Sequence, residues 1–173
     1  MAPKFIYGTA LSGFAASVPE ARLKALQNDA DVESVSIDGP IYAIGKPCAN
    51  CGVPAVQTIP WGVERIGSRN SLYTGAGIDV YVIDTGIDAK HPDLQAHTGN
   101  GYAVVQCIGR SCAASWDDNH GHGTHVSGTI GAINNSIDVV GVAPEAILHA
   151  VKVLNKMGSG TISGIITGID WVT

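Results

Sequence analysis

No stretch of about eighteen consecutive apolar residues occurs in the 173-residue sequence, so the sequence predicts no helix that would span a membrane. The first residues, MAPKFIYGTA, also lack the basic start and the long apolar run of a secretory signal peptide, and export cannot be read from them. Basic residues are not in excess, because the net charge is -5. Nucleic acid and anionic membrane surfaces are therefore poor candidates as partners.

Charged residues are few as well, at 14% of the chain, whereas 45% of the residues are hydrophobic. A disordered chain or a coiled coil would carry more charge than this. The 22 glycines indicate many tight turns. The composition predicts a folded globular protein, either one domain or one small domain with part of a larger one.

The four cysteines form two close pairs, Cys48 with Cys51 and Cys107 with Cys112. Each pair could form a local disulfide, contribute to a metal site or remain as free thiols. The second pair is spaced more widely than the CxxC knuckle of a zinc ribbon, which argues against zinc. Two short-range disulfides in an exported protein are the favoured interpretation, and free thiols stay open.

The beginning of the chain predicts a strand, a helix and a second strand. KFIYG alternates in hydropathy, and so does the stretch from 32 to 44. Between them, Ser17 and Glu20 have the spacing of a capping box, with Pro19 in the first helical turn. These 45 residues are too few to bury a core of their own, so we expect them to lean on another surface.

After a glycine- and proline-rich linker, the pattern alternates between strand and helix. The expected elements are a strand over 77–84, a helix over 122–133, a strand over 146–154 and a helix over 159–173. The last helix carries Ile162, Ile165, Ile166, Ile169 and Val172 at helical spacing. This order predicts an α/β fold with a parallel sheet covered by helices on both faces. In such sheets functional groups gather at the carboxyl ends of the strands.

Asp84 ends the first of these strands, and three histidines, His120, His122 and His125, stand where the next helix begins. Asp84 could simply cap its own turn, or it could meet a cationic partner. The histidines could bond to backbone at a helix start, form a zinc cage or include a catalytic base. The zinc interpretation is weak because adjacent glycines leave the rings unsupported and the glutamate of an HExxH motif is absent.

Two long motifs decide between these interpretations. VYVIDTGIDAKHPDL, followed after 38 residues by GHGTHVSGT, resembles the aspartate and histidine motifs of the subtilisin-like serine proteases, in the family's chain order. INNSIDVVGVAPEA resembles the family's calcium loop, AVKVLNKMGSGTISGIITGIDWV its substrate-edge segment and next helix, and TIPWGVERI its mature N-terminal region. The resemblance divides the chain into the second half of an inhibitory propeptide (1–45), a linker (46–55) and the first part of a catalytic domain (56–173).

The resemblance also implies roles for individual residues. Asp84 would orient the imidazole of His122, which would act as the general base, with His125 in a supporting position and His120 without an assignable role. The backbone of Gly158, Ser159 and Gly160 would pair with an extended polypeptide substrate. Leu154 and Ile162 would line apolar subsites beside that edge, although ordinary core packing explains both residues equally well.

A structural calcium ion is the cofactor that the resemblance implies. Its ligands would be the side chains of Gln57, Asp93 and Asn135 and the backbone carbonyls of Ile133, Ile137 and Val139. Without the resemblance, the asparagine-rich segment is simply a turn.

The serine nucleophile of the family, carried by a Gly-Thr-Ser-Met-Ala segment, does not occur in this sequence. We therefore expect a fragment with two of three catalytic residues, inactive alone, of a secreted, calcium-dependent endopeptidase whose propeptide segment binds its own catalytic domain. The alternative is a non-catalytic module that binds and inhibits a protease.

Overall fold

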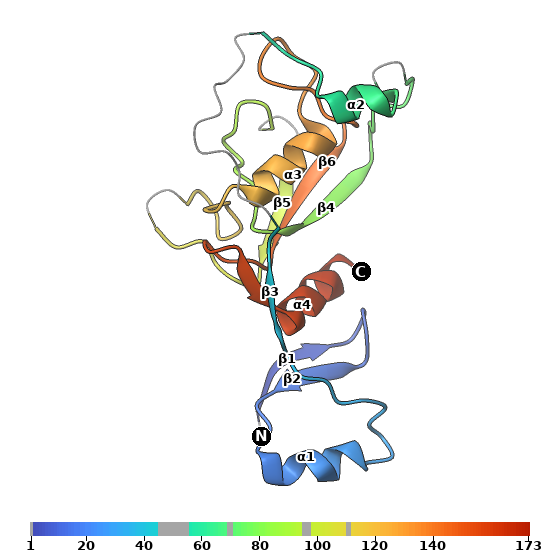
Figure 1. Ribbon diagram of the computed structural model, residues 1–173, viewed down its shortest axis with the longest axis vertical. Helices are drawn as coiled ribbons and strands as arrows, with labels where there is room; N and C mark the ends of the chain where they lie inside the picture. Colours follow the sequence, from blue (N-terminus) through green and yellow to red (C-terminus); the bar gives the residue numbers. More distant parts are fainter. Residues whose placement is uncertain (1, 45–55, 69–70, 95–97, 110–111) are drawn as a thin grey trace.

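The computed structural model describes residues 2–44, 56–68, 71–94, 98–109 and 112–173 (Figure 1). Its elements are, in chain order, β1 (Pro3–Tyr7), β2 (Gly13–Ala16), α1 (Glu20–Gln27), β3 (Pro40–Tyr42), α2 (Trp61–Arg65), β4 (Asp79–Asp84), β5 (Thr98–Ala103), α3 (His122–Gly131), β6 (Ile147–Lys152), β7 (Ser159–Thr161) and α4 (Ile162–Val172). The predicted α/β class is confirmed. None of the helices in these ranges has the length and apolar character needed to cross a bilayer.

The central sheet is parallel and has the strand order β4-β6-β5. Its register places Asp84, the last residue of β4, opposite Lys152, the last residue of β6. Both side chains therefore start from the carboxyl edge of the sheet, which is the edge where parallel α/β folds collect their functional groups.

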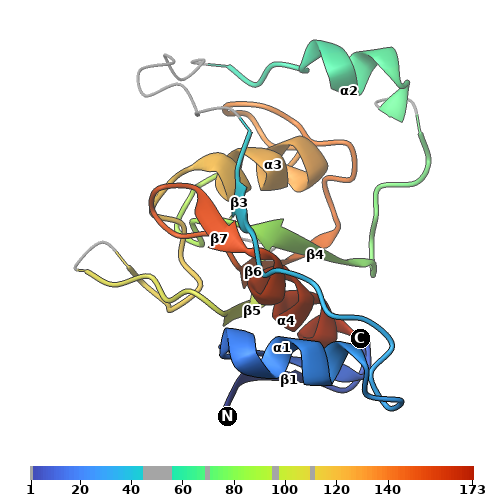
Figure 2. The same cartoon turned by 60° about the horizontal axis from the view of Figure 1, so that its bottom comes forward.

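Alternation along the strands gives each face of this sheet its own helix. Val82, Leu148 and Ala150 belong to a buried cluster against which Val126 and Ile130 of α3 pack. The intervening residues Ile83 and Val151 belong to a second cluster, together with Ile165 and Val172 of α4. Figure 2 shows the sheet between the two helices. The strands and helices expected in this part of the chain are confirmed, except that residues 159–161 form strand β7 and the last helix begins only at Ile162.

Strand β5 was not predicted because its sequence, TGNGYA, has no apolar alternation. Its glycines instead make room for aromatic rings. A Cβ atom on Gly101 would lie 2.5 Å from the ring of Trp116, and one on Gly99 would lie 2.6 Å from the ring of His149. The packing therefore requires glycine at positions where a strand pattern would call for larger side chains.

Two expectations for the N-terminal segment are wrong. Helix α1 begins after Pro19, which occupies the N-cap position in an extended conformation, and no side chain caps the helix, so Ser17 and Glu20 form no capping box. The strand expected over 32–44 is reduced to β3, because the chain before it is held to the start of α4. There the Asp38 carboxylate accepts hydrogen bonds from the amide of Ser163 (2.8 Å) and from its hydroxyl (2.6 Å).

The described residues 2–44 contain only one buried hydrophobic side chain, Tyr7, and the segment rests on α4. The Tyr7 hydroxyl donates to the carbonyl of Ser163 at 3.1 Å. The Asp170 carboxylate accepts from the amides of Gly8, Thr9 and Ala10 at 3.1, 2.6 and 2.7 Å. A segment with too little core of its own is thus attached to the larger unit by polar contacts at both ends of one helix.

Candidate active site

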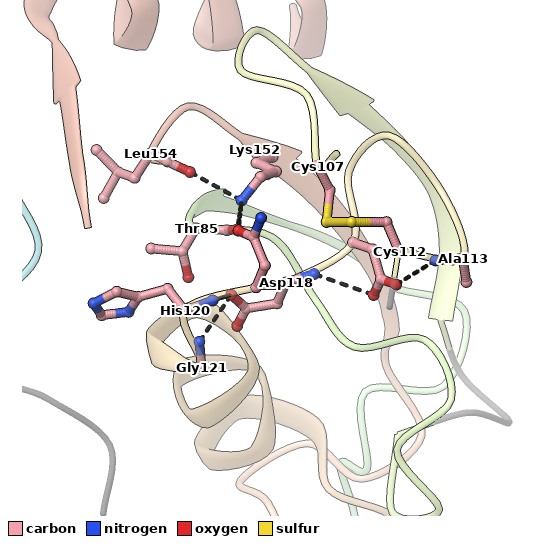
Figure 3. The surroundings of a disulfide bond; sticks show 11 residues. Thr85, Cys107, Cys112, Ala113, Asp118, His120, Gly121, Lys152 and Leu154 are labelled. Carbon is pink, nitrogen blue, oxygen red and sulfur yellow. Dashed lines mark hydrogen bonds between the residues drawn. A yellow bond between two sulfur atoms is a disulfide. The ribbon is translucent and has the colours of Figure 1, made fainter. Parts of the chain in front are cut away.

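The loop before α3 is organised by Asp118. One carboxylate oxygen accepts from the amides of His120 and Gly121, both at 2.9 Å (Figure 3). The other accepts from the amide and the hydroxyl of Thr124, at 2.9 and 2.6 Å. Burial alone would raise the pKa of Asp118, but these hydrogen bonds outweigh burial and hold the pKa below its ordinary value. A charged carboxylate therefore fixes the helix start that carries His122.

Asp84 and His122 meet directly. Nδ1 of His122 lies 2.8 Å from both carboxylate oxygens of Asp84. The two side chains are 23% and 13% exposed, so the pair is shielded from water on most sides. The backbone amide of Thr85 donates to Oδ1 of Asp84 at 2.6 Å, which fixes the carboxylate in turn. The strand end and the helix start thus produce an oriented imidazole with a partly buried carboxylate behind it.

The Asp84 carboxylate raises the pKa of His122 above its ordinary value of 6.5 by accepting its hydrogen bond. Partial burial of the ring opposes this effect, and the charge of Asp84, the Ile44 carbonyl and the charge of Asp118 add to it. A pKa that is higher in the folded chain stabilises the fold most below the unfolded value. The contribution of His122 is therefore fully present below about pH 6.5 and is lost as the pH rises through its folded pKa.

The second ring nitrogen of His122 also faces an acceptor. Nε2 lies 3.0 Å from the backbone carbonyl oxygen of Ile44, which follows β3. A neutral imidazole carries a single N–H, so both contacts are hydrogen bonds only when the ring is doubly protonated. In this arrangement Nε2 is occupied as a donor and has no lone pair with which to take a proton.

The residues expected at the substrate edge do lie beside an extended strand. β3 pairs antiparallel with β7, with Ile41 opposite Gly160 and Tyr42 opposite Ser159. The amide of Ala43 donates to the carbonyl of Gly158 at 2.7 Å. Segment 40–44 therefore runs along the edge from β7 to the imidazole of His122.

The two expected subsite residues differ in their surroundings. Leu154 is buried in the second cluster, and Ile41 and Ala43 of the bound segment pack against that cluster. The side chain of Ile162 is 45% exposed, and its amide donates to the carbonyl of Gly39 at 3.1 Å. Leu154 thus lies beneath the segment, whereas Ile162 lies at its entrance.

The expected calcium ligands converge, apart from one. Nε2 of Gln57 lies 2.8 Å from the carbonyl oxygen of Ile133, 3.2 Å from that of Val139 and 3.3 Å from Oδ1 of Asn135. The buried carboxylate of Asp93 accepts from the side-chain amide of Asn135 at 2.8 Å and from the backbone amide of Val139 at 3.3 Å. Ile137 is linked to this group only through its backbone amide, which donates to Oδ1 of Asn135.

Comparison with known proteins identifies the family of this chain. The model of the subtilase family matches residues 75–173, more than half of the chain. The chain belongs to the subtilase family.

A thermostable alkaline protease of Halalkalibacterium halodurans is 41% identical over 159 residues, which are 90% of this chain and 38% of that protein. Subtilisin E of Bacillus subtilis is 39% identical over 160 residues, covering 91% and 38%. Subtilisin Savinase of Lederbergia lenta is 47% identical over 118 residues, covering 66% and 41%. The chain spans less than half the length of these relatives.

The two histidines nearest to His122 in the sequence of this subtilase chain, His120 and His125, take no part in the contact with Asp84. The ring of His120 accepts from the backbone amide of His122 at 3.3 Å and lies against the backbone of Gly158. His125 is exposed, and its ring makes no hydrogen bond to any described residue. No contact therefore supports the role expected for it. Nor do the described residues include any group of three histidine, cysteine or acidic side chains placed to hold a metal ion.

Cys107 and Cys112 form a disulfide in the loop that leads to Asp118 (Figure 3). The carboxylate of Asp117 accepts from the amides of Ala113 at 2.6 Å and Asp118 at 3.1 Å, which ties this loop to the helix start. One of the two expected disulfides is thus confirmed. Cys48 and Cys51 lie outside the described residues, as does the linker 46–55.

Three residues that hydrogen-bond around Asp84 and His122 were missed from the sequence: Thr85, Asp118 and Lys152. Asp118 stands just before a helix start, where acidic residues are favoured. Lys152 is the one lysine or arginine in the apolar strand sequence AILHAVKVL, and a cation inside a buried strand must have polar partners. The sequence therefore contained a signal for Asp118 and one for Lys152, whereas nothing in it distinguished Thr85 from an ordinary turn residue.

Proposed function

We propose that the protein carrying this chain is a serine endopeptidase in which Asp84 and His122 activate a serine. The contact between His122 Nδ1 and both Asp84 oxygens, at 2.8 Å, is the observation that supports this proposal most strongly. His122 takes the proton of the attacking hydroxyl at Nε2 and returns it to the leaving amine, while Asp84 holds the ring and stabilises the imidazolium. Polypeptide is the substrate class, as the protease names of the relatives suggest.

A serine for this role is not found beside His122 among the described residues. Ser127 lies on α3 itself, is fully buried and has no hydrogen-bond partner for its hydroxyl. We therefore expect residues 1–173 by themselves to remain inactive.

A fluorophosphonate probe, which reacts with activated serines, tests the function. In the longest natural form of the protein that carries this sequence, we expect labelling that falls by about three orders of magnitude or more in His122→Ala. His125→Ala is the matched control, because His125 lies on the same helix but is exposed, and it should label normally. Labelling that survives in His122→Ala would contradict the proposal.

The segment 40–44 acts, in this proposal, as an internal inhibitor that occupies the substrate edge. Its antiparallel pairing with β7 supports this role, because an added strand is how proteases commonly hold extended peptides. The carbonyl of Ile44 at Nε2 of His122 keeps the base protonated and engaged. The Ile44 side chain is 92% exposed, so the backbone rather than the side chain makes this contact.

Replacing Ala43 by proline tests the internal inhibitor. Proline has no N–H to donate to the Gly158 carbonyl, so we expect the segment to loosen and the amide of Ile162, which bonds to Gly39, to exchange with solvent about tenfold faster. Ala43→Gly keeps the N–H and is the control. The role of the segment is refuted if both variants leave the exchange rate of Ile162 unchanged.

The same β3–β7 pairing also favours a second candidate, a non-catalytic module whose N-terminal segment inhibits another protease. The fluorophosphonate experiment separates the two candidates. A long form that stays unlabelled, yet inhibits a purified subtilisin, would support the inhibitory module over the endopeptidase.

The oxygens around Gln57 support a structural calcium site. The donors are two backbone carbonyls, an amide oxygen and one carboxylate, which is the hard oxygen set that Ca²⁺ prefers. The amide N–H₂ of Gln57 points into these oxygens, and a half-turn of that amide would add its own oxygen to the set. Gln57, Asp93 and Asn135 would hold the ion through side chains, Ile133 and Val139 through carbonyls, and Ile137 is the least supported ligand.

Calcium should raise the thermal stability of the chain. At a free concentration about one hundred times the dissociation constant, we expect the midpoint of unfolding to rise by about 5–10 °C. Asp93→Asn removes the only charged ligand and should abolish most of this rise, whereas Asp31→Asn, at an exposed position, should not. A calcium-induced rise that is equal in both variants would place the ion elsewhere.

We also propose that the protein is secreted. The disulfide between Cys107 and Cys112 supports an oxidising compartment, because disulfides are rare where thiols are kept reduced.

A further inference from the structure

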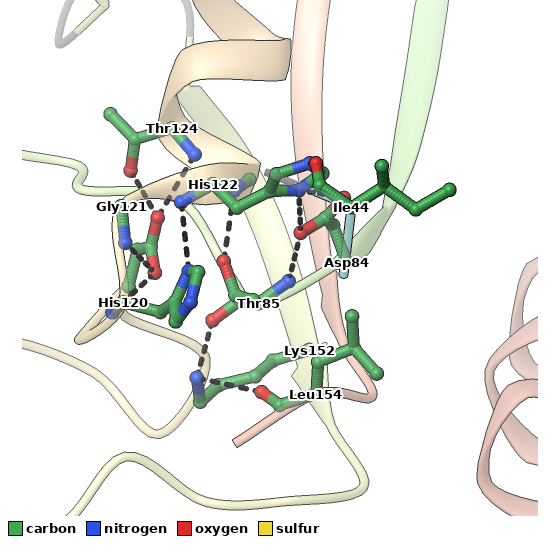
Figure 4. A network of polar contacts seen from close by, with 11 residues as sticks. Ile44, Asp84, Thr85, His120, Gly121, His122, Thr124, Lys152 and Leu154 are labelled. Atoms are coloured by element: carbon green, nitrogen blue, oxygen red, sulfur yellow. Dashed lines mark hydrogen bonds and ion pairs between the residues drawn. The ribbon is translucent and has the colours of Figure 1, made fainter. Parts of the chain in front are cut away.

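Lys152, the last residue of β6, is completely buried. Its ammonium group donates to three oxygens. Two are the backbone carbonyls of Thr85 and of Leu154, the latter at 3.0 Å (Figure 4). The third is the side-chain oxygen of Asn119 at 3.0 Å. An ammonium group has three N–H donors and no acceptor, so all of its donors are used. A buried cation is tolerated only when it is satisfied in this way.

The partners of Lys152 are the segments that hold Asp84. Thr85 follows Asp84, and its amide donates to the Asp84 carboxylate. The amide of Leu154 donates to the backbone carbonyl of Asp84 at 3.1 Å. Lys152 itself lies opposite Asp84 in the parallel register of β4 and β6. The ammonium group thus joins Thr85 and Leu154, two residues whose amides donate to Asp84.

Lys152 is also connected to the helix that carries His122. The Thr85 hydroxyl accepts from the amide of Gly123, the residue after His122, at 2.8 Å. Asn119 lies three residues before His122, in the loop that Asp118 organises. One buried side chain therefore links the strand end that bears the acid to the loop and helix that bear the base.

The surroundings of Lys152 affect the balance between its charged and neutral forms. Burial lowers the pKa of Lys152 below its ordinary value, and the carboxylates of Asp118, Asp117 and Asp84 oppose this effect. A neutral amine has only two N–H groups and would turn its lone pair toward one of the three oxygens. The hydrogen-bond geometry thus favours the ammonium form.

We propose that Lys152 is a positioning residue for the Asp84–His122 pair, on which it acts through the backbone of Thr85 and the side chain of Asn119. The inference rests on the proposed function only in giving the Asp84–His122 pair a catalytic role. The contact between the two side chains is itself present in this chain. Lys152 is too far inside the sheet edge to be a partner of the substrate, because none of its surface is exposed.

Positioning and simple charge effects have opposite signs at His122. A nearby cation disfavours protonation of an imidazole, so loss of the charge alone would raise the pKa of His122. Loss of positioning weakens the hydrogen bond from Nδ1 to Asp84, and that hydrogen bond is the main reason why the pKa is raised. A variant without the ammonium group therefore distinguishes the two effects by the direction of the change.

The test uses Lys152→Met, which keeps the length of the side chain and removes its donors and charge. In residues 1–173, NMR titration of the His122 ring should show a lower midpoint than in the parent chain. His149 is the internal control: its Nε2 lies 2.6 Å from Oδ1 of Asp79 at the other end of β4, and its ring resonances at a fixed pH should not shift. A His122 midpoint that rises or stays the same would overturn the proposal.

Amide hydrogen exchange separates positioning from general stabilisation. In Lys152→Met the amides of Thr85 and Gly123, which bond to Asp84 and Thr85, should exchange about tenfold faster, while the amides of Leu148 and Ala150 in the centre of β6 keep their rates. Equal acceleration of all four amides would mean that Lys152 merely stabilises the core, and the proposal would fail.

Asn119→Ala covers the case in which Lys152→Met does not fold. It removes one of the three acceptors and leaves the ammonium charge in place, so a charge effect on His122 is absent. We expect a smaller fall of the His122 midpoint in the same direction, and no fall would refute the proposal. Failure of fluorophosphonate labelling in the longer protein would refute the proposed protease without affecting these measurements.

Discussion

Asp84→Asn should lower the rate of peptide hydrolysis by about four orders of magnitude in the longest natural form of the protein. Asparagine has nearly the shape of aspartate but no charge, so the imidazolium formed during proton transfer loses its stabilising anion. The asparagine amide can also donate to Nδ1 of His122, which would favour the wrong tautomer. The ring would then present an N–H, rather than a lone pair, at Nε2.

Asp79→Asn is the matched control for this substitution. Asp79 begins the same strand that Asp84 ends, and its carboxylate pairs with His149 rather than with His122. Hydrolysis should remain close to the parent rate in this variant. An Asp84→Asn protein that kept more than about a tenth of the activity would show that His122 does not depend on the carboxylate.

Gly123→Ala should destabilise the chain by about 2 kcal/mol or more and separate Asp84 from His122. A Cβ atom at this position would lie 2.2 Å from the carbonyl oxygen of Gly86 and 3.2 Å from Cβ of Asp84. The neighbours are backbone and a fixed strand residue, so α3 itself would have to move away from β4. The measurement is chemical unfolding, together with the titration of His122.

Gly128 provides the control on the same helix. A Cβ atom there has no neighbour within 4 Å, so Gly128→Ala adds only helix propensity and should stabilise the chain by about 0.5–1 kcal/mol. The two substitutions are chemically identical and differ only in their surroundings. Equal effects on stability would mean that α3 does not approach β4 as closely as the structure indicates.

The central sheet and its two helices were predictable because burial leaves a periodic pattern in the sequence. The alternation of Val80, Val82 and Leu148, Ala150 is the sequence signal of the face that α3 covers. The same argument misjudged α4. Ile162 and Ile169 follow the helical spacing but are 45% and 37% exposed, whereas Gly168 is buried. A Cβ atom on Gly168 would lie 2.8 Å from Val153, so close approach of small residues, which hydropathy does not register, sets this packing.

The candidate site was predictable only where a motif carried it. Asp84 and His122 were chosen by resemblance, and their meeting could not have been derived from spacing because it depends on how α3 crosses β4. The contact of Ile44 with His122 joins residues 78 positions apart, and no local pattern encodes such a contact. Lys152 and Asp118 act through hydrogen bonds to backbone groups, whose positions exist only in the folded chain.

The most direct test is NMR titration of the His122 ring in residues 1–173, with and without Asp84→Asn. The parent chain should titrate above the ordinary histidine value of 6.5, and the midpoint should fall toward that value in Asp84→Asn because the raising hydrogen bond and charge are lost. A parent midpoint at or below 6.5 that Asp84→Asn leaves in place would contradict the account, since His122 would then titrate without any help from Asp84.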